Sequence, residues 1–155
     1  MSDLRPPTLL ALPSYLAGHV ARIGRNHLDE PLKEHELRLP HFAVLAALSD
    51  FGPLVQHELA HRLGLNRSHL VGYLDEIEQR GLVERVRDPE DRRRQRVAIT
   101  ASGRTVFRRL KGAAARSERL ALDVLSETER ETLTALLRRV VVADDDARAG
   151  QLPDA

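Results

Sequence analysis

The chain has 155 residues, no cysteine and a formal net charge of +1 at pH 7. This length allows one compact domain with helical extensions and excludes a large multidomain enzyme. Without cysteine, the chain cannot form a disulfide framework, a thiolate metal site or a thiol-based redox sensor, as expected in a reducing cytoplasm. The N-terminus lacks the pattern of a secretory signal, and no apolar run is long enough to cross a membrane. We therefore expect a cytoplasmic protein without a membrane partner.

The charged residues are segregated along the chain. The segment from Arg62 to Arg119 holds 15 Lys and Arg against 8 Asp and Glu, so the two ends together are acidic. A basic middle between acidic ends is typical of a surface that binds a polyanion, because phosphate contacts depend on local charge. A solvated charged surface has the same pattern. Aromatic residues make up only 3% of the chain, which argues against a stacking platform for single-stranded nucleic acid.

The first two predicted elements are amphipathic helices. Pro13 fits the first turn of a helix in which apolar residues recur at spacings of three to five. The stretch HELRLP (residues 35–40) ends this helix, and Pro40 opens a second one. The second helix ends at the turn signal in residues 50–53, which contains Gly52 and Pro53.

Two shorter helices follow, separated by a tight turn. The stretch QHELAHRLG predicts a helix that ends at Gly64, and Asn66 is a suitable N-cap for the next helix, which Gly81 ends. The turn between them has the length and the glycine of a helix-turn-helix motif. The apolar stripe of the second of these helices consists of Leu70, Leu74 and Ile77.

A β-hairpin interrupts the helices. LVERVR and RVAIT alternate apolar and polar residues and flank the charged segment DPEDRRRQ, which predicts two strands with a long tip. Thr100 then caps a helix from about 101 to 124, and Ser126 with Glu129 forms a capping box ahead of a last apolar stripe. The acidic end after Asp144 is expected to fray.

This order of elements predicts a fold that is mainly α with a small β-hairpin wing: a winged helix-turn-helix lobe plus a helical dimerisation region from both termini. The last apolar stripe and the first helix together offer more apolar surface than such a lobe can cover, which favours a homodimer. The predicted parts are an N-terminal dimerisation helix (8–37), the DNA-binding lobe (38–100, with the recognition helix at about 66–80 and the wing at about 82–99), C-terminal dimerisation helices (101–147) and a flexible tail (148–155).

Residues 58–103 resemble the signature of the MarR family of bacterial and archaeal regulators. The resemblance includes the wing pattern Asp-x-Arg-Arg and the Leu/Ile-Thr-x-x-Gly that begins the next helix. It implies a transcriptional regulator without enzymatic activity that represses by binding a pseudo-palindromic double-stranded DNA operator. It further implies a homodimer held by its first and last helices, a recognition helix in the major groove, a wing in the minor groove, and often release by a small-molecule effector.

The recognition helix supplies the first set of candidate DNA contacts. Its N-terminal turn reaches base edges in helix-turn-helix proteins, which indicates Arg67, Ser68 and His69. Gly72 and Tyr73 complete this set. Relatives often carry a larger polar or basic residue at the position of Gly72. Either the protein makes fewer contacts with bases there, or the backbone approaches the DNA more closely than a side chain would permit.

The wing supplies the second set. Arginines at a hairpin tip can enter a narrow minor groove, where the negative potential is strongest, whereas a chance surface run would form only weak ion pairs. By resemblance, Arg93 is the minor-groove arginine, and Asp91 is the acid that pairs with a nearby arginine to stabilise the wing. The wing arginines are Arg92, Arg93 and Arg94. Weaker candidates for phosphate contacts are Arg62, Arg85, Arg87 and Arg96.

Two alternatives compete with this interpretation. His57-Glu58-Leu59-Ala60-His61 satisfies the HExxH pattern of zinc metallopeptidases. A catalytic zinc needs a third ligand, however, and this short segment is already accounted for by the helix-turn-helix, so we predict no metal, cofactor or catalytic residue. The second alternative is an interaction module whose basic segment binds another polyanion, such as RNA or an acidic protein.

Several histidines lie in or near the first two predicted helices. Within the MarR family, this is the region between the dimer helices and the DNA-binding lobe where an effector tends to bind. A histidine can pair with a carboxylate or phenolate, so the resemblance predicts a small aromatic or anionic effector, with Tyr15, His19 and His41 as candidate pocket residues. A histidine with an ordinary structural hydrogen bond fits the same pattern.

Overall fold

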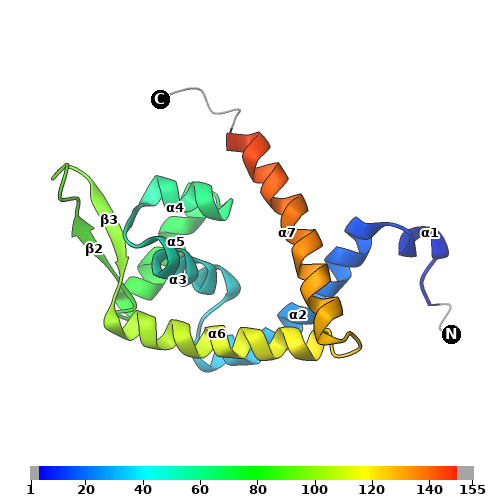
Figure 1. Cartoon of the computed structure of the whole chain (residues 1–155). Coiled ribbons are helices and arrows are strands. Elements are labelled where there is room, and N and C mark those ends of the chain that lie inside the picture. Colours follow the sequence, from blue (N-terminus) through cyan, green and yellow to red (C-terminus); the bar gives the residue numbers. More distant parts are fainter. Residues whose placement is uncertain (1–3, 150–155) are drawn as a thin grey trace.

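The computed structural model describes residues 4–149, which form helices around one small sheet (Figure 1). The N-terminal helices are α1 (Pro7–Leu10), α2 (Pro13–Glu34) and α3 (Leu39–Phe51). Next come β1 (Leu54–Val55), α4 (Gln56–Leu63), α5 (Arg67–Gln79), β2 (Val83–Arg87) and β3 (Gln95–Ile99). The chain continues with the long helices α6 (Ala101–Ala121) and α7 (Glu127–Ala149).

Short-range signals in the sequence explain most of these boundaries. The Asn66 side chain accepts a hydrogen bond from the Ser68 N–H at 2.9 Å and caps α5, as predicted. Gly64 ends α4 in the left-handed conformation with φ of 61°. Thr100 caps α6 through the Gly103 N–H at 3.0 Å. Each of these contacts joins residues close together in the chain, which is why the sequence pattern predicts them.

The sheet has three strands rather than the two predicted. Its order is β1-β3-β2, with both neighbours antiparallel, and β1 pairs Leu54 with Val97 of the central strand. β1 contains only two residues and has no alternating pattern of its own, so periodicity could not reveal it. This added strand ties the start of α4 to the base of the wing.

A hydrophobic core fixes the position of α5. Leu70, Leu74 and Ile77 are fully buried against Leu45 and Leu59 from the two preceding helices and their neighbours. Burial of each such side chain contributes about 1.5–3 kcal/mol. The core therefore determines which face of α5 remains exposed.

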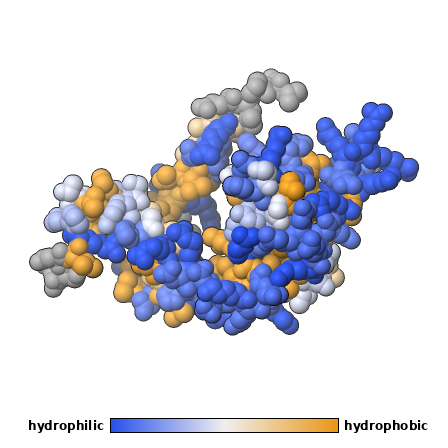
Figure 2. Space-filling view, turned by 180° about the vertical axis from the view of Figure 1, so that it is seen from behind, coloured by the Kyte–Doolittle hydropathy of each residue, from blue (hydrophilic) through white to orange (hydrophobic). Residues whose placement is uncertain are grey.

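The terminal helices extend away from this lobe. In Figure 1, α6 runs beneath α3, α4 and α5, and α7 projects from the far end of α6. None of the residues of α7 between Glu127 and Ala149 is buried. Figure 2 shows hydrophobic side chains at the end of the molecule that carries the terminal helices, whereas the end that carries the wing is hydrophilic. The large exposed hydrophobic residues of α2 and α7 include Leu16, Ile23, Leu136, Leu137, Val140, Val141 and Val142.

Two boundaries in the C-terminal part differ from the expected ones. The helix predicted over 101–124 ends at Ala121, because Leu122 leaves the helical conformation as its C-cap. The segment after Asp144 is helical through Ala149, and the predicted tail therefore overlaps the helix at residues 148–149. The Arg148 guanidinium lies 2.8 Å from the Asp144 carboxylate one turn earlier, which supports this last turn. The rest of the predicted tail, residues 150–155, lies outside the described residues.

The helices differ in length, but none within residues 4–149 combines the length and the apolar composition that a membrane span requires.

Candidate nucleic-acid interface

The N-terminal turn of α5 is exposed to solvent. Arg67, Ser68 and His69 are all exposed, as a base-contacting turn requires. The Ser68 hydroxyl lies 2.6 Å from Oδ1 of Asn66 and takes part in the cap. Arg67 and His69 therefore have the side chains with the most freedom to meet a ligand.

Gly72 and Tyr73 lie in different surroundings, although they are neighbours in α5. Gly72 is exposed, and a β-carbon added there would meet no described atom within 4 Å. Packing within the described chain therefore does not require glycine at this position. Tyr73 is half-buried, and its ring stands edge-on to the His41 ring with the centroids 5.4 Å apart. The ring of Tyr73 thus packs toward α3.

The wing presents three consecutive exposed arginines at its tip, Arg92, Arg93 and Arg94. Asp91 shapes this tip, since its Oδ1 accepts a hydrogen bond from the Arg93 N–H at 3.0 Å. Its other carboxylate oxygen lies 3.8 Å from Nε of Arg94, which is a long ion-pair distance. The contact of Asp91 with the backbone is therefore closer than its contact with an arginine side chain.

Asp88 is the buried acid of the wing, and the sequence analysis did not single it out. It is 5% exposed, and its carboxylate accepts hydrogen bonds from the Glu90 N–H and from Nε of Arg96, each at 2.9 Å. These bonds, that of Glu90 first, hold the pKa of Asp88 below its ordinary value. The Asp-Pro pair at residues 88–89 indicated only a turn, and the burial of Asp88 depends on strand pairing.

Three of the four arginines proposed for phosphate contacts have carboxylate partners within the chain, and one of them, Arg62, pairs with Glu58 inside α4. The other two arginines pair with acids outside their own strands. Arg96 holds Asp88, as described above. Arg85 of β2 pairs with two acids of α5, contacting Asp75 at 2.8 Å and also Glu78. These pairs join the strands of the wing to each other and to the recognition helix, and they lower the capacity of both arginines to bind an additional anion.

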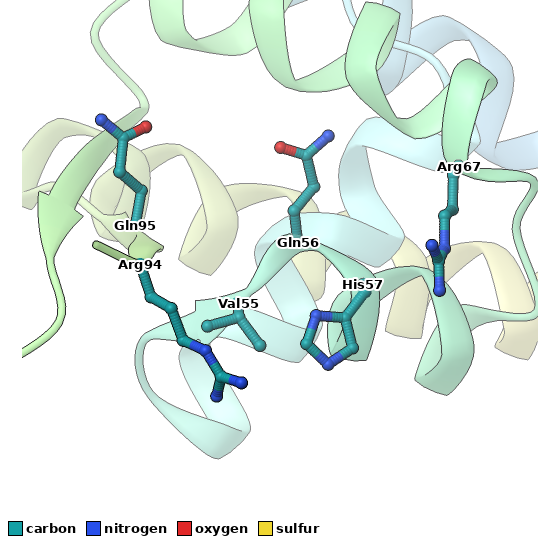
Figure 3. Close-up of a pocket in the computed structure, with 6 residues that line it drawn as sticks. All are labelled: Val55, Gln56, His57, Arg67, Arg94 and Gln95. Carbon is teal, nitrogen blue, oxygen red and sulfur yellow. The ribbon is translucent and has the colours of Figure 1, made fainter. Parts of the chain in front are cut away.

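A hollow of about 320 Å³ lies where α4, α5 and the wing meet (Figure 3). Arg67 comes from the start of α5, Arg94 from the wing loop just before β3, and His57 from the first turn of α4. In Figure 3, the two arginine side chains lie on either side of His57. The hollow therefore has two guanidinium groups and no acid among its lining residues, which suits a phosphate group. Its other lining residues are Val55, Gln56 and Gln95.

The HExxH segment forms α4, the first helix of the helix-turn-helix. Its Glu58 carboxylate lies 2.8 Å from the Arg62 guanidinium, and His61 is exposed. Among residues 4–149, no three His, Cys, Asp or Glu side chains converge as a metal ion would need. The described chain thus offers no third ligand to His57 and His61.

The three candidate effector residues do not lie together in the described chain. Tyr15 and His19 contact each other on α2, with ring centroids 4.5 Å apart. Burial, followed by the charges of Arg5 and Arg22, lowers the pKa of His19. His41 instead lies in the first turn of α3 and packs against Tyr73 of α5. Tyr15, His19 and His41 do not line the hollow beside Arg67, and they do not line a second hollow of about 380 Å³ that lies between α4 and the wing.

Comparison with known proteins places this arrangement in a family. The MarR family profile matches residues 37–94. Over 106 residues the chain is 31% identical to the HTH-type transcriptional repressor NicR of Pseudomonas putida, covering 68% of this chain and 67% of NicR. Two further curated regulators are matched over 61% and 65% of their own length.

Solved structures share the whole fold. The transcriptional regulator PcaV of Streptomyces coelicolor, in complex with its natural ligand, is 32% identical, with a TM-score of 0.72 over 93% of this chain and 99% of PcaV. The transcriptional repressor CouR bound to a 23-mer DNA duplex is 28% identical, with a TM-score of 0.79 over 90% of this chain and 99% of that one. CouR of Rhodococcus jostii has also been solved with p-coumaroyl-CoA, at 26% identity and a TM-score of 0.75 over 87% of this chain and 95% of that one. The chain belongs to the MarR family of winged helix-turn-helix, DNA-binding transcriptional regulators.

Proposed function

We propose that the protein is a repressor that binds a pseudo-palindromic operator in double-stranded DNA as a homodimer. The observation that carries this proposal is the hollow shared by Arg67 and Arg94. Because the start of the recognition helix and the wing loop line one surface, a single DNA backbone can contact both. The phosphate between the two contacts then fixes the register of the protein on the duplex.

In this mode of binding, the two exposed sets of residues have different tasks. Arg67 and His69 meet base edges in the major groove, where Arg can donate two hydrogen bonds to guanine. The arginines at the wing tip enter the adjacent minor groove, and Arg93 is the residue that we assign to its floor. Both sets are exposed, which supports their assignment to a ligand.

The homodimer follows from the unpartnered apolar surface of the terminal helices. Val140 of α7 is 71% exposed and Leu16 of α2 is 40% exposed. Apolar side chains that gather on one side of a chain in this number mark an interface. A two-fold axis through this surface would present two α5 helices to half-sites about one helical turn of DNA apart.

We further propose that a small aromatic or anionic molecule releases the DNA. This rests on PcaV and CouR, whose structures contain a natural ligand and p-coumaroyl-CoA respectively. Tyr15 and His19 lie on α2, which carries part of the proposed dimer surface, and they are the first candidates for contacts with this effector. His41 is a weaker candidate, because it is 1% exposed and already has protein partners. The protein performs no covalent chemistry in this proposal and acts in the cytoplasm.

Sequence-selective footprinting on the DNA upstream of the protein's own gene tests the proposal. We expect protection of a pseudo-palindromic site that persists when unlabelled DNA of unrelated sequence is in excess. Protection that disappears in competition with unrelated DNA or RNA would instead identify a general polyanion-binding module, because the electrostatic component of binding carries no sequence information.

A further inference from the structure

The connection between α2 and α3 contains a strained residue that contacts the recognition helix. Glu36 has φ of 51°, in the left-handed region that favours glycine, and the Leu37 N–H bonds to the Leu32 carbonyl at 2.9 Å across it. The Glu36 carboxylate accepts a hydrogen bond at 2.8 Å from Arg80, the C-cap of α5. The same guanidinium donates to the carbonyl of His35 at 2.6 Å. The unusual backbone therefore coincides with a contact to α5.

A second group of contacts joins the start of α3 to Glu76, in the C-terminal half of α5. One guanidinium nitrogen of Arg38 lies 2.9 and 2.8 Å from the two carboxylate oxygens of Glu76. Nε2 of His41 lies 2.8 Å from the same carboxylate, without the alignment of a regular hydrogen bond. Nδ1 of His41 accepts the Arg38 N–H at 3.0 Å, so the histidine also caps α3.

Tyr73 completes this group. The Arg38 guanidinium lies 5.2 Å from the centroid of the Tyr73 ring, a favourable cation–π distance, and the His41 ring packs edge-on against the same ring. His41 is 1% exposed, so part of this polar cluster is sealed from water. The side chains of Arg38 and Glu76 are 59% and 50% exposed, so water screens their ion pair. The buried His41 and the half-buried Tyr73 are the members of the cluster that hold its geometry.

These contacts act on only one half of the recognition helix. Glu76 and Arg80 lie toward its C-terminal end, and on another side Asp75 pairs with Arg85 of β2. The N-terminal turn with Arg67 and His69 stays exposed. Because an α-helix behaves as a rigid rod over this length, contacts at one end determine where the other end points.

We propose that the connection between α2 and α3 is a brace that sets the orientation of the recognition helix relative to α2. We call the contacts of Glu36, Arg38 and His41 with Glu76 and Arg80 the α2–α3 brace. The inference rests on the proposed function, since it concerns how precisely α5 reaches base edges. Glu76 is a positioning residue here: a carboxylate would repel DNA phosphates, and its partners are protein groups.

The brace also gives a physical route from the dimerisation half to the DNA-binding lobe. Glu36 directly follows the C-cap of α2, so a displacement of the C-terminal end of α2 moves the residues that hold Glu76 and Arg80. An effector that shifts α2 can thereby change the direction of α5 without touching it.

Binding selectivity measures the brace directly. The full-length wild-type protein first enriches a duplex from a randomised pool, and each variant is then titrated with that duplex and with a scrambled duplex of equal length at fixed salt. For Glu76→Gln and Arg38→Lys, we expect the ratio of the two dissociation constants to fall about five- to tenfold, with affinity for the scrambled duplex nearly unchanged. In the double variant Arg38→Glu/Glu76→Arg, which restores an ion pair, the ratio should recover relative to Glu76→Arg alone.

Glu58→Gln is the matched control, because it removes an equal charge from an ion pair of 2.8 Å that lies within one helix of the same lobe. Its selectivity ratio should equal that of the wild type. All variants are compared at a temperature where circular dichroism shows them folded. Folded Glu76→Gln and Arg38→Lys proteins that keep the wild-type ratio would overturn the brace, as would a double variant no better than Glu76→Arg.

Hydrogen exchange of the free protein tests the brace independently of the proposed function. Without DNA, Glu76→Gln should speed amide exchange in the last two turns of α5 and the first turn of α3 about tenfold, and Glu58→Gln should not. If the wild type enriches no sequence, the proposed function fails, and the exchange data alone decide for or against the brace. Equal exchange in Glu76→Gln and wild type would refute it.

Discussion

The backbone of Gly103, in the first turn of α6, lies against the carbonyl oxygen of Leu82, just before β2. A β-carbon at Gly103 would lie 2.0 Å from that oxygen and 2.8 Å from the Ile99 side chain. The clashing atom at Leu82 belongs to the backbone, which has little freedom to move, since the same carbonyl accepts the Thr100 N–H at 3.0 Å. This close approach packs the wing onto α6.

Gly103→Ala should therefore destabilise the protein by roughly 3 kcal/mol or more, because the added methyl group must displace backbone. Urea unfolding followed by circular dichroism measures the change. Gly72→Ala is the matched control: with open space around it in a helix interior, it should stabilise by about 1 kcal/mol. Equal effects of the two substitutions would contradict the packing argument.

Arg93→Ala should weaken binding to the selected duplex by about tenfold or more at fixed salt, because it removes the guanidinium assigned to the minor groove. Fluorescence anisotropy with the labelled duplex measures the loss. Arg139→Ala on α7 removes the same charge far along the chain from the wing and should have a much smaller effect. If both substitutions weaken binding equally, net charge rather than a specific groove contact accounts for the loss.

Asp88→Asn tests the support of the wing rather than its contact with DNA. The substitution removes the charge that holds Arg96 while keeping a similar shape, so the wing should become more mobile and affinity for the duplex should fall by about threefold, less than for Arg93→Ala. Because the pKa of Asp88 is lowered in the folded state, its contribution to stability is present above the unfolded pKa and is lost as the pH falls through the folded pKa. Acid unfolding of Asp88→Asn should accordingly depend less on pH in that range.

His41 should make stability depend on pH in a higher range. Burial lowers its pKa below 6.5 in the folded state, and although Glu76 opposes the shift, burial outweighs it. The unfolded chain then binds more protons between the folded pKa and about 6.5, so stability is complete above this window and falls as the pH drops through it, by at most about 1.4 kcal/mol per pH unit.

His41→Gln keeps an acceptor for the Arg38 N–H and removes the titrating group. The difference between the unfolding free energies of wild type and variant, measured from pH 5 to 8, isolates His41 from the other histidines. A difference that stays constant over this range would show that His41 does not titrate differently in the two states.

Val140→Lys should dissociate the homodimer. Val140 is 71% exposed in the single chain, so the substitution costs the isolated fold little, whereas a charge buried between two subunits is strongly unfavourable. Sedimentation velocity should show a monomer, with weaker binding to the two-half-site duplex. Ala135→Lys, which lies off the stripe formed by Leu137, Val140 and Val141, is the control and should remain dimeric. A dimeric Val140→Lys protein would place the interface elsewhere.

Features encoded by residues near one another in the chain were accessible from sequence. Asn66 and Thr100 were predicted as N-caps, and Ser126 with Glu129 as a capping box, because each side chain meets a backbone N–H within three residues. The recognition helix and the hairpin followed from hydrophobic periods of 3.6 and 2. The charge of the wing tip was equally legible, since three arginines are adjacent.

Features that depend on the meeting of distant segments were not accessible. β1 exists only because Leu54 pairs with Val97, and two residues carry no periodic signal. The sequence carries no signal for the contact of Glu76 with Arg38, which lies thirty-eight positions earlier. It also does not reveal that Arg85, a candidate for a phosphate contact, pairs with acids of α5. Which charged side chains pair with each other depends on how whole helices and strands pack against one another.

The sequence by itself thus determined the order of the long helices and the hairpin, several helix caps and the segments that carry positive charge, because these depend on local backbone preferences and on composition. Only the tertiary structure decided which charges remain free for a ligand. It leaves Arg67 and Arg93 exposed, it buries Asp88 within the wing, and it holds Glu76 beside Arg38 and His41. The reason is physical: hydrophobic burial fixes how the helices pack, and that packing brings each charged side chain to its partner or to solvent.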